Sequence, residues 1–168
     1  MSDTLVVVDT SLGSFTLALD AAHAPKSVAN FLAYVDAKHY DGTIFHRVID
    51  GFMTQGGGYD AAYEKKPVKA PVDNEADNGL KNLRGTVAMA RTGEPHSATA
   101  QWFVNVADNA FLDHKNKTTA GWGYTVFGKV TDGMDVVEKM KAVKTGAHGP
   151  FAKDAPEVPI VIRSIRRA

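Results

Sequence analysis

The sequence predicts a fold built mainly of β-strands, either an α+β arrangement or a β barrel that helices cap. Most of the chain consists of short stretches rich in β-branched and aromatic residues, separated by Gly, Pro, Asn and Asp. Two segments instead repeat apolar residues at helical spacing, one from Pro25 and one from about Asp132. Two isolated helices among many short strands indicate that the helices cover a sheet and do not alternate with its strands.

The bulk composition is ordinary for one globular domain, and residues 1–168 are expected to form it: 44% of the residues are hydrophobic and 23% are charged. The chain has 19 basic residues (Lys and Arg) and 19 acidic residues (Asp and Glu). This balance gives no net positive field that would attract nucleic acid or an acidic membrane. The absence of cysteine excludes disulfides, thiol nucleophiles and cysteine-bound metals. The basic C-terminal residues are interpreted as a solvated edge; they are Arg163, Arg166 and Arg167.

Nothing in the sequence resembles a membrane span or a basic leader peptide. No apolar run approaches the length of about 20 residues that a spanning helix needs. Met1 to Thr4 leads directly into an apolar strand. These features predict a cytoplasmic protein. A secreted protein from which a leader has been removed is the alternative that the sequence leaves open.

A pair of short strands and a helix are expected at the beginning of the chain. Residues 5–9 and 15–19 are expected to form the strands, because large apolar residues alternate with small or polar ones in the second of them. The helix begins at Pro25, a residue that suits the first helical turn. Its apolar stripe is Val28, Phe31, Leu32 and Val35.

The second half of the chain adds further strands and the second helix. A long irregular connection, residues 59–85, comes first and contains a candidate helical turn at residues 74–80. A short turn with two large apolar side chains is expected at residues 109–113. The inner side of the second helix is expected to carry Met134, Val137 and Met140. The remaining expected strands are residues 86–90, 101–106, 124–130 and 158–165.

The stretch from Thr43 to Gly58 has the most unusual combination of side chains. Residues 44–49 are expected to form one strand of a hairpin and residues 52–55 the other, with a turn between them. Arg47 then lies among apolar neighbours, either with its stem along the surface or as part of a site. Three glycines follow and let the backbone bend sharply. A phosphate-binding loop is excluded, because no Gly-Lys-Ser or Gly-Lys-Thr follows.

Four motifs follow one another along the chain. They are Phe-His-Arg-Val-Ile at residues 45–49, Gly-Phe-Met-Thr-Gln-Gly-Gly at 51–57, Ala-Met-Ala-Arg at 88–91 and Val-Phe-Gly-Lys-Val at 126–130. In order and spacing they resemble the motifs of the cyclophilins, the peptidyl-prolyl cis-trans isomerases. The resemblance extends from Val6 to Ile165, and the residues at 74–80 and 96–101 are similar to those of bacterial members.

The resemblance implies a mainly β fold, a closed eight-stranded antiparallel barrel capped by two helices. It also implies an isomerase that catalyses rotation about Xaa-Pro peptide bonds and assists protein folding. The implied partners are proline-containing peptides and unfolded or flexible protein chains. Neither a cofactor nor a metal is implied, and the protein is expected to be a monomer.

The resemblance assigns a substrate groove to the outer face of the barrel. Arg47 is the implied catalytic residue. The implied proline pocket consists of Phe52, Met53, Phe103 and Leu112. The residues implied to hold the peptide backbone are Gln55, Ala90 and Gln101, and those implied to line the rim are His46, Phe111 and Tyr124.

Some positions depart from the pattern of eukaryotic cyclophilins. Asp50 stands where proline is usual, Arg91 where asparagine is, Trp102 where phenylalanine is, Phe111 where tryptophan is and Tyr124 where histidine is. None of these changes removes a group that the isomerisation needs. Because Phe111 replaces a tryptophan at the rim, the cyclic peptide cyclosporin is expected to bind with weakened affinity.

The residue types fit this chemistry on physical grounds. Rotation about an Xaa-Pro bond breaks no bond, so it requires no nucleophile, metal or redox group. The six histidines have no metal-ligand spacing, and His96–Ser97 lacks the Gly-x-Ser-x-Gly motif of many hydrolases. A donor such as Arg47 can favour the twisted amide in a dry pocket.

Two other classes of function compete with an isomerase. A binding module would hold proline-containing segments in the same groove with incidental turnover, but such a module has little need for Arg47. A carrier would hold a small molecule inside the barrel, which is disfavoured because side chains fill small barrels.

Overall fold

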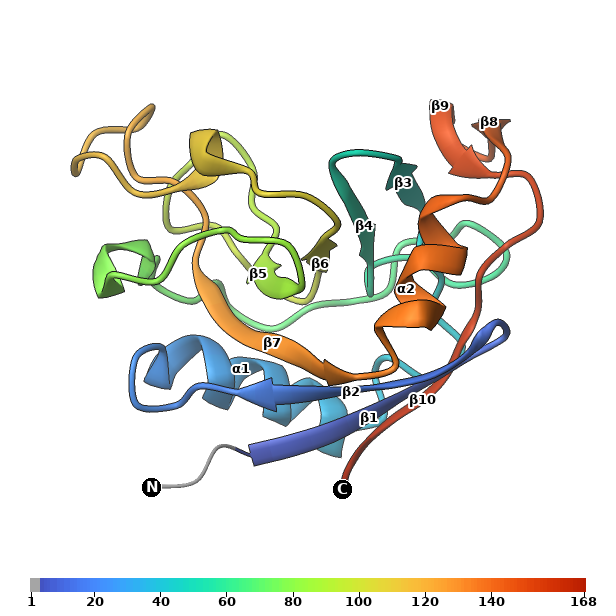
Figure 1. Cartoon of the computed structure of the whole chain (residues 1–168), viewed down its shortest axis with the longest axis horizontal. Helices are drawn as coiled ribbons and strands as arrows, with labels where there is room; N and C mark the ends of the chain where they lie inside the picture. Colours follow the sequence, from blue (N-terminus) through green and yellow to red (C-terminus); the bar gives the residue numbers. More distant parts are fainter. Residues whose placement is uncertain (1–3) are drawn as a thin grey trace.

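The computed structural model describes residues 4–168 and consists of a curled sheet, two helices and a small separate hairpin (Figure 1). The strands of the main sheet are β1 (Thr4–Thr10), β2 (Gly13–Leu19), β3 (Arg47–Ile49), β4 (Met53–Gly56), β5 (Thr86–Met89), β6 (Trp102–Asn105), β7 (Val126–Asp132) and β10 (Ile162–Arg167). The helices are α1 (Pro25–Asp36) and α2 (Met134–Lys141). Short 3₁₀ turns lie at Ala76–Asn78 and Ala110–Leu112, within the two segments where single turns were expected.

The main sheet is antiparallel throughout, with the strand order β10-β1-β2-β7-β5-β6-β4-β3. It curls until its two outer strands approach each other. A bridge between Ile44 and Val161, just before β3 and β10, joins them, and the Phe45 N–H donates to the Ile160 carbonyl at 3.0 Å. The predicted eight antiparallel strands with two helices are confirmed. The predicted closure is achieved by this short bridge and not by a continuous ladder.

The main hydrophobic core lies inside the curl. The two-residue period of β6 turns Trp102 and Val104 inward, and both are fully buried. Phe31 of α1 packs edge-on against Trp102, with ring centroids 5.6 Å apart, and Val137 of α2 joins the same cluster. Side chains fill the part of the interior that the structure describes, which argues against the small-molecule carrier.

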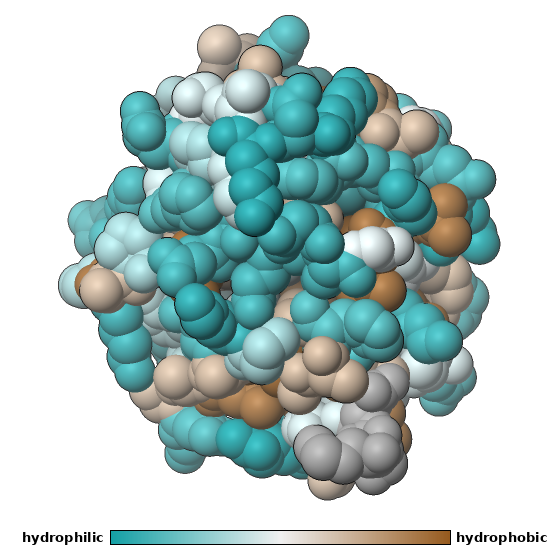
Figure 2. Space-filling model, turned by 90° about the vertical axis from the view of Figure 1, so that its left-hand side faces the viewer, coloured by the Kyte–Doolittle hydropathy of each residue, from teal (hydrophilic) through white to brown (hydrophobic). Residues whose placement is uncertain are grey.

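Both helices bury the faces that the spacing predicts. In α1, Val28, Phe31 and Val35 are buried and Leu32 packs against the core. In α2, Val137 and Met140 are buried and Met134 is partly buried. Neither these helices nor any other among residues 4–168 is long and apolar enough to cross a membrane. The face at the left-hand end of the molecule is mainly hydrophilic, with small separate apolar patches (Figure 2).

The expected strand at residues 44–49 is regular only from Arg47 onward. Ile44 bridges to Val161, whereas Arg47 pairs with β4. Between these partners the alternation breaks, since Phe45 and Val48, three positions apart, both belong to the main core. A regular strand would place Phe45 and Val48 on opposite faces. The expectation of one strand over residues 44–49 is therefore wrong at residues 45–46, where the chain changes its pairing partner.

A second, two-stranded sheet was not expected from the sequence. It consists of β8 (Thr145–His148) and β9 (Phe151–Pro156), which pair antiparallel. The hairpin forms a sheet of its own and lies at the upper right of Figure 1. Its second strand lies beside β3, where Arg47 begins the strand.

Candidate active site

The register of the central strands brings several predicted site residues into one row on the outer face of the sheet. Arg47 of β3 lies opposite Gln55 of β4, and Gln55 lies opposite Phe103 of β6. Phe103 in turn lies opposite Ala88 of β5. Residues directly opposite each other share a face and have Cβ atoms about 4.5–5.5 Å apart. Met53 lies on the same face, because it is two residues from Gln55 along one strand.

These residues surround a pocket of about 110 Å³. Sites for drug-sized ligands measure about 300–1,000 Å³, so this pocket suits a single side chain. Its apolar wall belongs to a second hydrophobic cluster, separate from the main core, in which Met53, Phe103 and Leu112 are buried. The complete lining is Arg47, Phe52, Met53, Gln55, Ala90, Arg91, Phe103, Leu112 and Tyr124.

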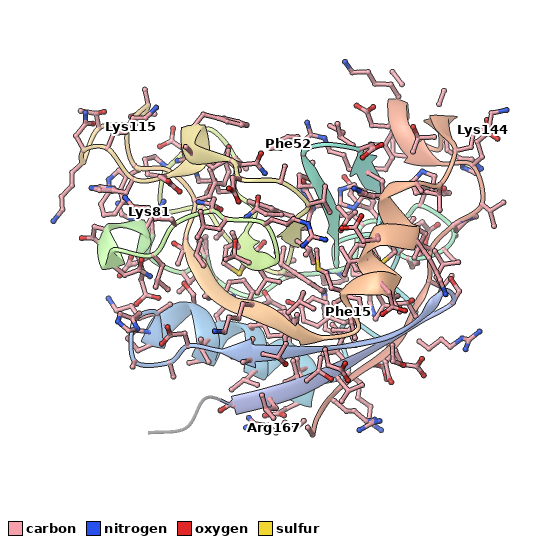
Figure 3. The ribbon with its side chains drawn as sticks, viewed as in Figure 1. Phe15, Phe52, Lys81, Lys115, Lys144 and Arg167 are labelled. Carbon is pink, nitrogen blue, oxygen red and sulfur yellow. The ribbon has the colours of Figure 1, made fainter. Side chains whose placement is uncertain are left out.

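Gln101 and Phe111 lie beside the pocket. The Gln55 Nε2 donates to the Gln101 Oε1 at 2.9 Å. Gly58 makes room for this arrangement, since a Cβ there would lie 2.5 Å from the Gln101 side chain. Phe111 is 63% exposed and packs against Phe52, with ring centroids 5.5 Å apart. Phe52 lies at the upper edge of the molecule, at the turn between β3 and β4 (Figure 3).

Comparison with protein families gives a match over nearly the whole chain. The model described as "Cyclophilin type peptidyl-prolyl cis-trans isomerase/CLD" matches residues 5–167. The chain belongs to the cyclophilins. It is 58% identical over 161 residues to peptidyl-prolyl cis-trans isomerase cyp18 of Streptomyces antibioticus, covering 96% of each chain. Peptidyl-prolyl cis-trans isomerase B of Escherichia coli is 50% identical, over 96% of this chain and 98% of its own. The predicted similarity to bacterial members is confirmed, and the chain is a peptidyl-prolyl cis-trans isomerase.

Solved structures agree with the fold of this cyclophilin. The crystal structure of a cyclophilin type peptidyl-prolyl cis-trans isomerase from Cryptosporidium parvum superimposes with a TM-score of 0.80 at 26% identity, covering 99% of this chain and 98% of that one. A second crystal structure of that protein, in the presence of the dipeptide Ala-Pro, gives a TM-score of 0.79. The mainly β fold expected from the resemblance is therefore confirmed.

His46 is the expected rim residue that the structure places away from the pocket of this cyclophilin. It is 4% exposed, and its ring stacks on Phe151 with centroids 5.1 Å apart and meets Tyr59 edge-on at 4.8 Å. Consecutive side chains in extended backbone point to opposite faces, so a groove-facing Arg47 turns His46 away from the groove. The prediction that His46 lines the rim is contradicted for this reason.

Burial has a strong effect on the protonation of His46. Desolvation, and to a smaller extent the positive charge of Arg47, lower the pKa of His46 to about 4. The unperturbed pKa is about 6.5. Between these two values the unfolded chain binds a proton at this position that the folded protein does not bind. The free energy of unfolding therefore falls as the pH decreases from about 6.5 to about 4.

We expect the free energy of unfolding to fall by about 2 kcal/mol between pH 7 and pH 5 through His46 alone. Urea unfolding at the two pH values measures the change. Burial also lowers the pKa of His39, which reduces the stability at low pH in the same way. The contribution of His46 is therefore the pH-dependent loss of stability in the wild type minus the loss in His46→Phe. An equal loss in both proteins would show that His46 does not cause it.

A network of three buried asparagines holds the pocket together, and sequence analysis did not find it. The Asn105 Nδ2 donates to the Asn82 Oδ1 and to the Thr86 Oγ1, both at 3.0 Å. The Asn109 Nδ2 donates to the Asn105 Oδ1 at 2.8 Å and to the Phe52 carbonyl at 2.9 Å. Asn105 therefore links β6 to the start of β5 and, through Asn109, to the turn that carries Phe52.

Proposed function

We propose that this cyclophilin holds the proline ring of an Xaa-Pro segment in the apolar pocket while Arg47 stabilises the twisted amide. The observation that carries the proposal is the convergence of the Arg47 guanidinium and three buried apolar side chains on a single pocket of about 110 Å³. The three side chains are Met53, Phe103 and Leu112. A pocket of this size fits one compact ring better than an extended ligand.

Arg47 can act on the reaction because rotation changes the electronic structure of the amide. Twisting the bond removes resonance and returns an electron pair to the prolyl nitrogen. A guanidinium is always charged and carries its donors in a rigid fork. A donor aimed at the nitrogen therefore interacts more strongly with the twisted amide than with the planar one, and this difference lowers the barrier.

The other groove residues bind the rest of the peptide in this proposal. Gln55, Ala90 and Gln101 hold the backbone around the rotating bond, and the direct hydrogen bond between the two glutamines orients their amides. Phe111 and Tyr124 form the rim, where Phe103 and Tyr124 meet edge-on with ring centroids 5.9 Å apart.

The size of the barrier shows that Arg47 does not act alone. Uncatalysed rotation takes tens to hundreds of seconds over a barrier of about 18–20 kcal/mol. A turnover of roughly 10³ per second needs about five decades of acceleration, or about 7 kcal/mol. One preorganised donor supplies about 3–4 kcal/mol. The apolar wall must supply the remainder by excluding water and fixing the proline.

We propose proline-containing peptides and flexible or unfolded protein chains as substrates. The relative from Cryptosporidium parvum has been crystallised in the presence of Ala-Pro, which supports an Xaa-Pro ligand for a member of this family with the same fold. A small pocket at the surface, beside the exposed ring of Phe111, can receive only an accessible proline. An Xaa-Pro bond inside a folded core cannot reach it.

Exchange spectroscopy on an Ala-Pro peptide tests the proposal. A catalytic amount of protein should produce exchange between the cis and trans resonances on the time scale of seconds or faster, whereas the uncatalysed reaction is slower. A binding module with the same groove would shift or broaden the peptide resonances without accelerating the interconversion. That second result would contradict the isomerase assignment and favour the binding module.

The exposed Phe111 gives a prediction about cyclosporin. Cyclophilins that bind cyclosporin tightly resemble this chain but carry a tryptophan at this position, and phenylalanine has no N–H to donate. A lost hydrogen bond costs about 0.5–1.5 kcal/mol, or about 1–3 kcal/mol if an acceptor is left buried and unpaired. Phe111→Trp should therefore tighten cyclosporin binding by about tenfold or more, as measured by inhibition titration, and change kcat/KM by less than about threefold. Unchanged inhibition would mean that other groove residues determine the affinity.

A further inference from the structure

A second pocket adjoins the proposed proline pocket. It has a volume of about 130 Å³ and shares Gln55, Ala90 and Arg91 with the first pocket. An extended peptide with its proline in the first pocket can therefore place a neighbouring side chain in the second. In extended backbone, residues two positions apart point to the same side. The residue two positions from the proline is the one whose side chain can enter.

Arg91 lies between the two pockets and has donors without partners. Its guanidinium stacks on the ring of Tyr124, with the Cζ 4.9 Å from the ring centroid. The Nε and Nη1 atoms are buried, and neither has a hydrogen-bond partner in the described part of the chain. The stacking fixes the plane of the guanidinium. Its third nitrogen, Nη2, is not among the buried unpaired atoms, so it is the donor that a group in the pocket can reach.

The charged side chains that line the second pocket are all positive. Lys65 and Arg91 both line it, and its lining contains neither Asp nor Glu. In residues 4–168, no carboxylate lies within ion-pairing distance of Arg91. Ser97, which also lines the pocket, holds the surrounding loop closed by donating to the Glu94 carbonyl at 2.6 Å and accepting from the Thr92 N–H at 2.9 Å.

We propose that the second pocket binds an acidic side chain of the substrate, so that this cyclophilin prefers Xaa-Pro segments with Asp or Glu two residues from the proline. Arg91 is the specificity-determining residue, because it adjoins both pockets, and Lys65 adds charge at the second. The inference rests on the proposed function, which places the proline in the first pocket. Charge-assisted hydrogen bonds to a carboxylate are stronger than neutral ones.

Peptides that differ at one position test this preference. There are two series of peptides. In the first, the residue two positions before the proline is Glu, Gln or Lys. In the second, the residue two positions after the proline is varied in the same way. Exchange spectroscopy gives kcat/KM for each peptide at low salt. In one of the two series we expect the order Glu, then Gln, then Lys, with roughly a fivefold ratio of Glu to Gln. This ratio should shrink as salt is raised to about 0.5 M, because ions screen the interaction.

Three variants assign the preference to Arg91. Arg91→Gln should bring the Glu-to-Gln ratio close to one, and Arg91→Lys should restore part of it. Arg166→Gln removes the same charge from an exposed position on β10. Figure 3 labels the next residue of this strand, Arg167, at the side of the molecule opposite Phe52. This control should keep the wild-type ratio. Each variant is judged by its own ratio of kcat/KM for the Glu and Gln peptides. A general loss of activity lowers both values and leaves this ratio unchanged.

The possible outcomes separate this inference from the proposed function. If the wild type isomerises the Glu and Gln peptides equally well in both series, the acidic preference is refuted and the isomerase assignment stands. If it isomerises none of the peptides, the proposed function itself fails. A preference that persists unchanged in Arg91→Gln would refute Arg91 as the specificity-determining residue. A preference that disappears in Arg166→Gln would show that the net field of the protein and not the second pocket selects the substrate.

Discussion

Replacing Arg47 with alanine should lower kcat/KM for an Ala-Pro peptide by about 10²–10³. The substitution removes the one donor that we place at the prolyl nitrogen, and it leaves the apolar wall of the pocket intact. Removing one preorganised donor from an active site typically costs this much. Arg47→Lys should recover only part of the loss, because an ammonium keeps the charge without the planar fork of donors.

The fold should tolerate this substitution. Arg47 is exposed at the start of β3 and belongs to neither hydrophobic cluster. Exposed substitutions of this kind usually change the free energy of unfolding by less than about 0.5 kcal/mol. Urea unfolding and near-UV circular dichroism check this point, with Arg166→Ala as a charge-matched control that should retain full activity. Wild-type turnover by Arg47→Ala would refute the role of Arg47, and a collapsed fold would show that the residue is structural.

Elements with one buried face could be predicted from the sequence, and elements without one could not. The strands at residues 5–9 and 15–19 and the helix from Pro25 alternate or repeat apolar residues because each packs on the core. Most residues of the β8–β9 hairpin are at least partly buried, and buried and exposed positions do not alternate along it, so hydrophobicity leaves no periodic signal in it. Its turn depends on Gly149, whose φ is +53°, and β9 contains Asp154 at φ +63°, conformations that only local backbone geometry reveals.

The candidate site could likewise be predicted from the sequence only in part. The family resemblance implied Arg47 and the apolar pocket residues, and the register then explains why residues from four strands meet. The rim prediction for His46 failed because a motif groups neighbours in sequence, while a strand separates them onto opposite faces. Arg91 was visible only as a departure from a family pattern. Its importance depends on stacking against Tyr124, which is distant in sequence.

The asparagine network could not be predicted, because Asn in a sequence usually indicates a turn. Asn105 is fully buried at the end of β6, opposite Met53. Its side chain satisfies groups on Asn82, Thr86 and Asn109 at the same time. Only the folded structure brings these residues together.

Replacing Asn105 with alanine should lower the free energy of unfolding by about 3 kcal/mol. The substitution leaves the Asn82 Oδ1 without its donor and removes one acceptor from the Asn109 Nδ2. Each buried group left unpaired costs about 1–3 kcal/mol. The total is below the stability of about 5–15 kcal/mol that is typical of a domain, so the variant should fold. We also expect kcat/KM to fall severalfold, because the anchor of the Phe52 turn is weakened.

The neighbouring strand offers a matched control for this prediction. Thr54 of β4 is also fully buried, but its Oγ1 has no hydrogen-bond partner among residues 4–168. Thr54→Val removes a buried hydroxyl that satisfies nothing, so it should leave the stability unchanged or raise it. Urea unfolding of the wild type and the two variants, at pH 7, measures both effects. Equal stabilities of Asn105→Ala and Thr54→Val would show that the network does not hold the pocket. A large loss of stability in Asn105→Ala, with none in Thr54→Val, would show that the hydrogen bonds of Asn105 fix the turn that carries Phe52. Burial of a polar group would then not be sufficient by itself.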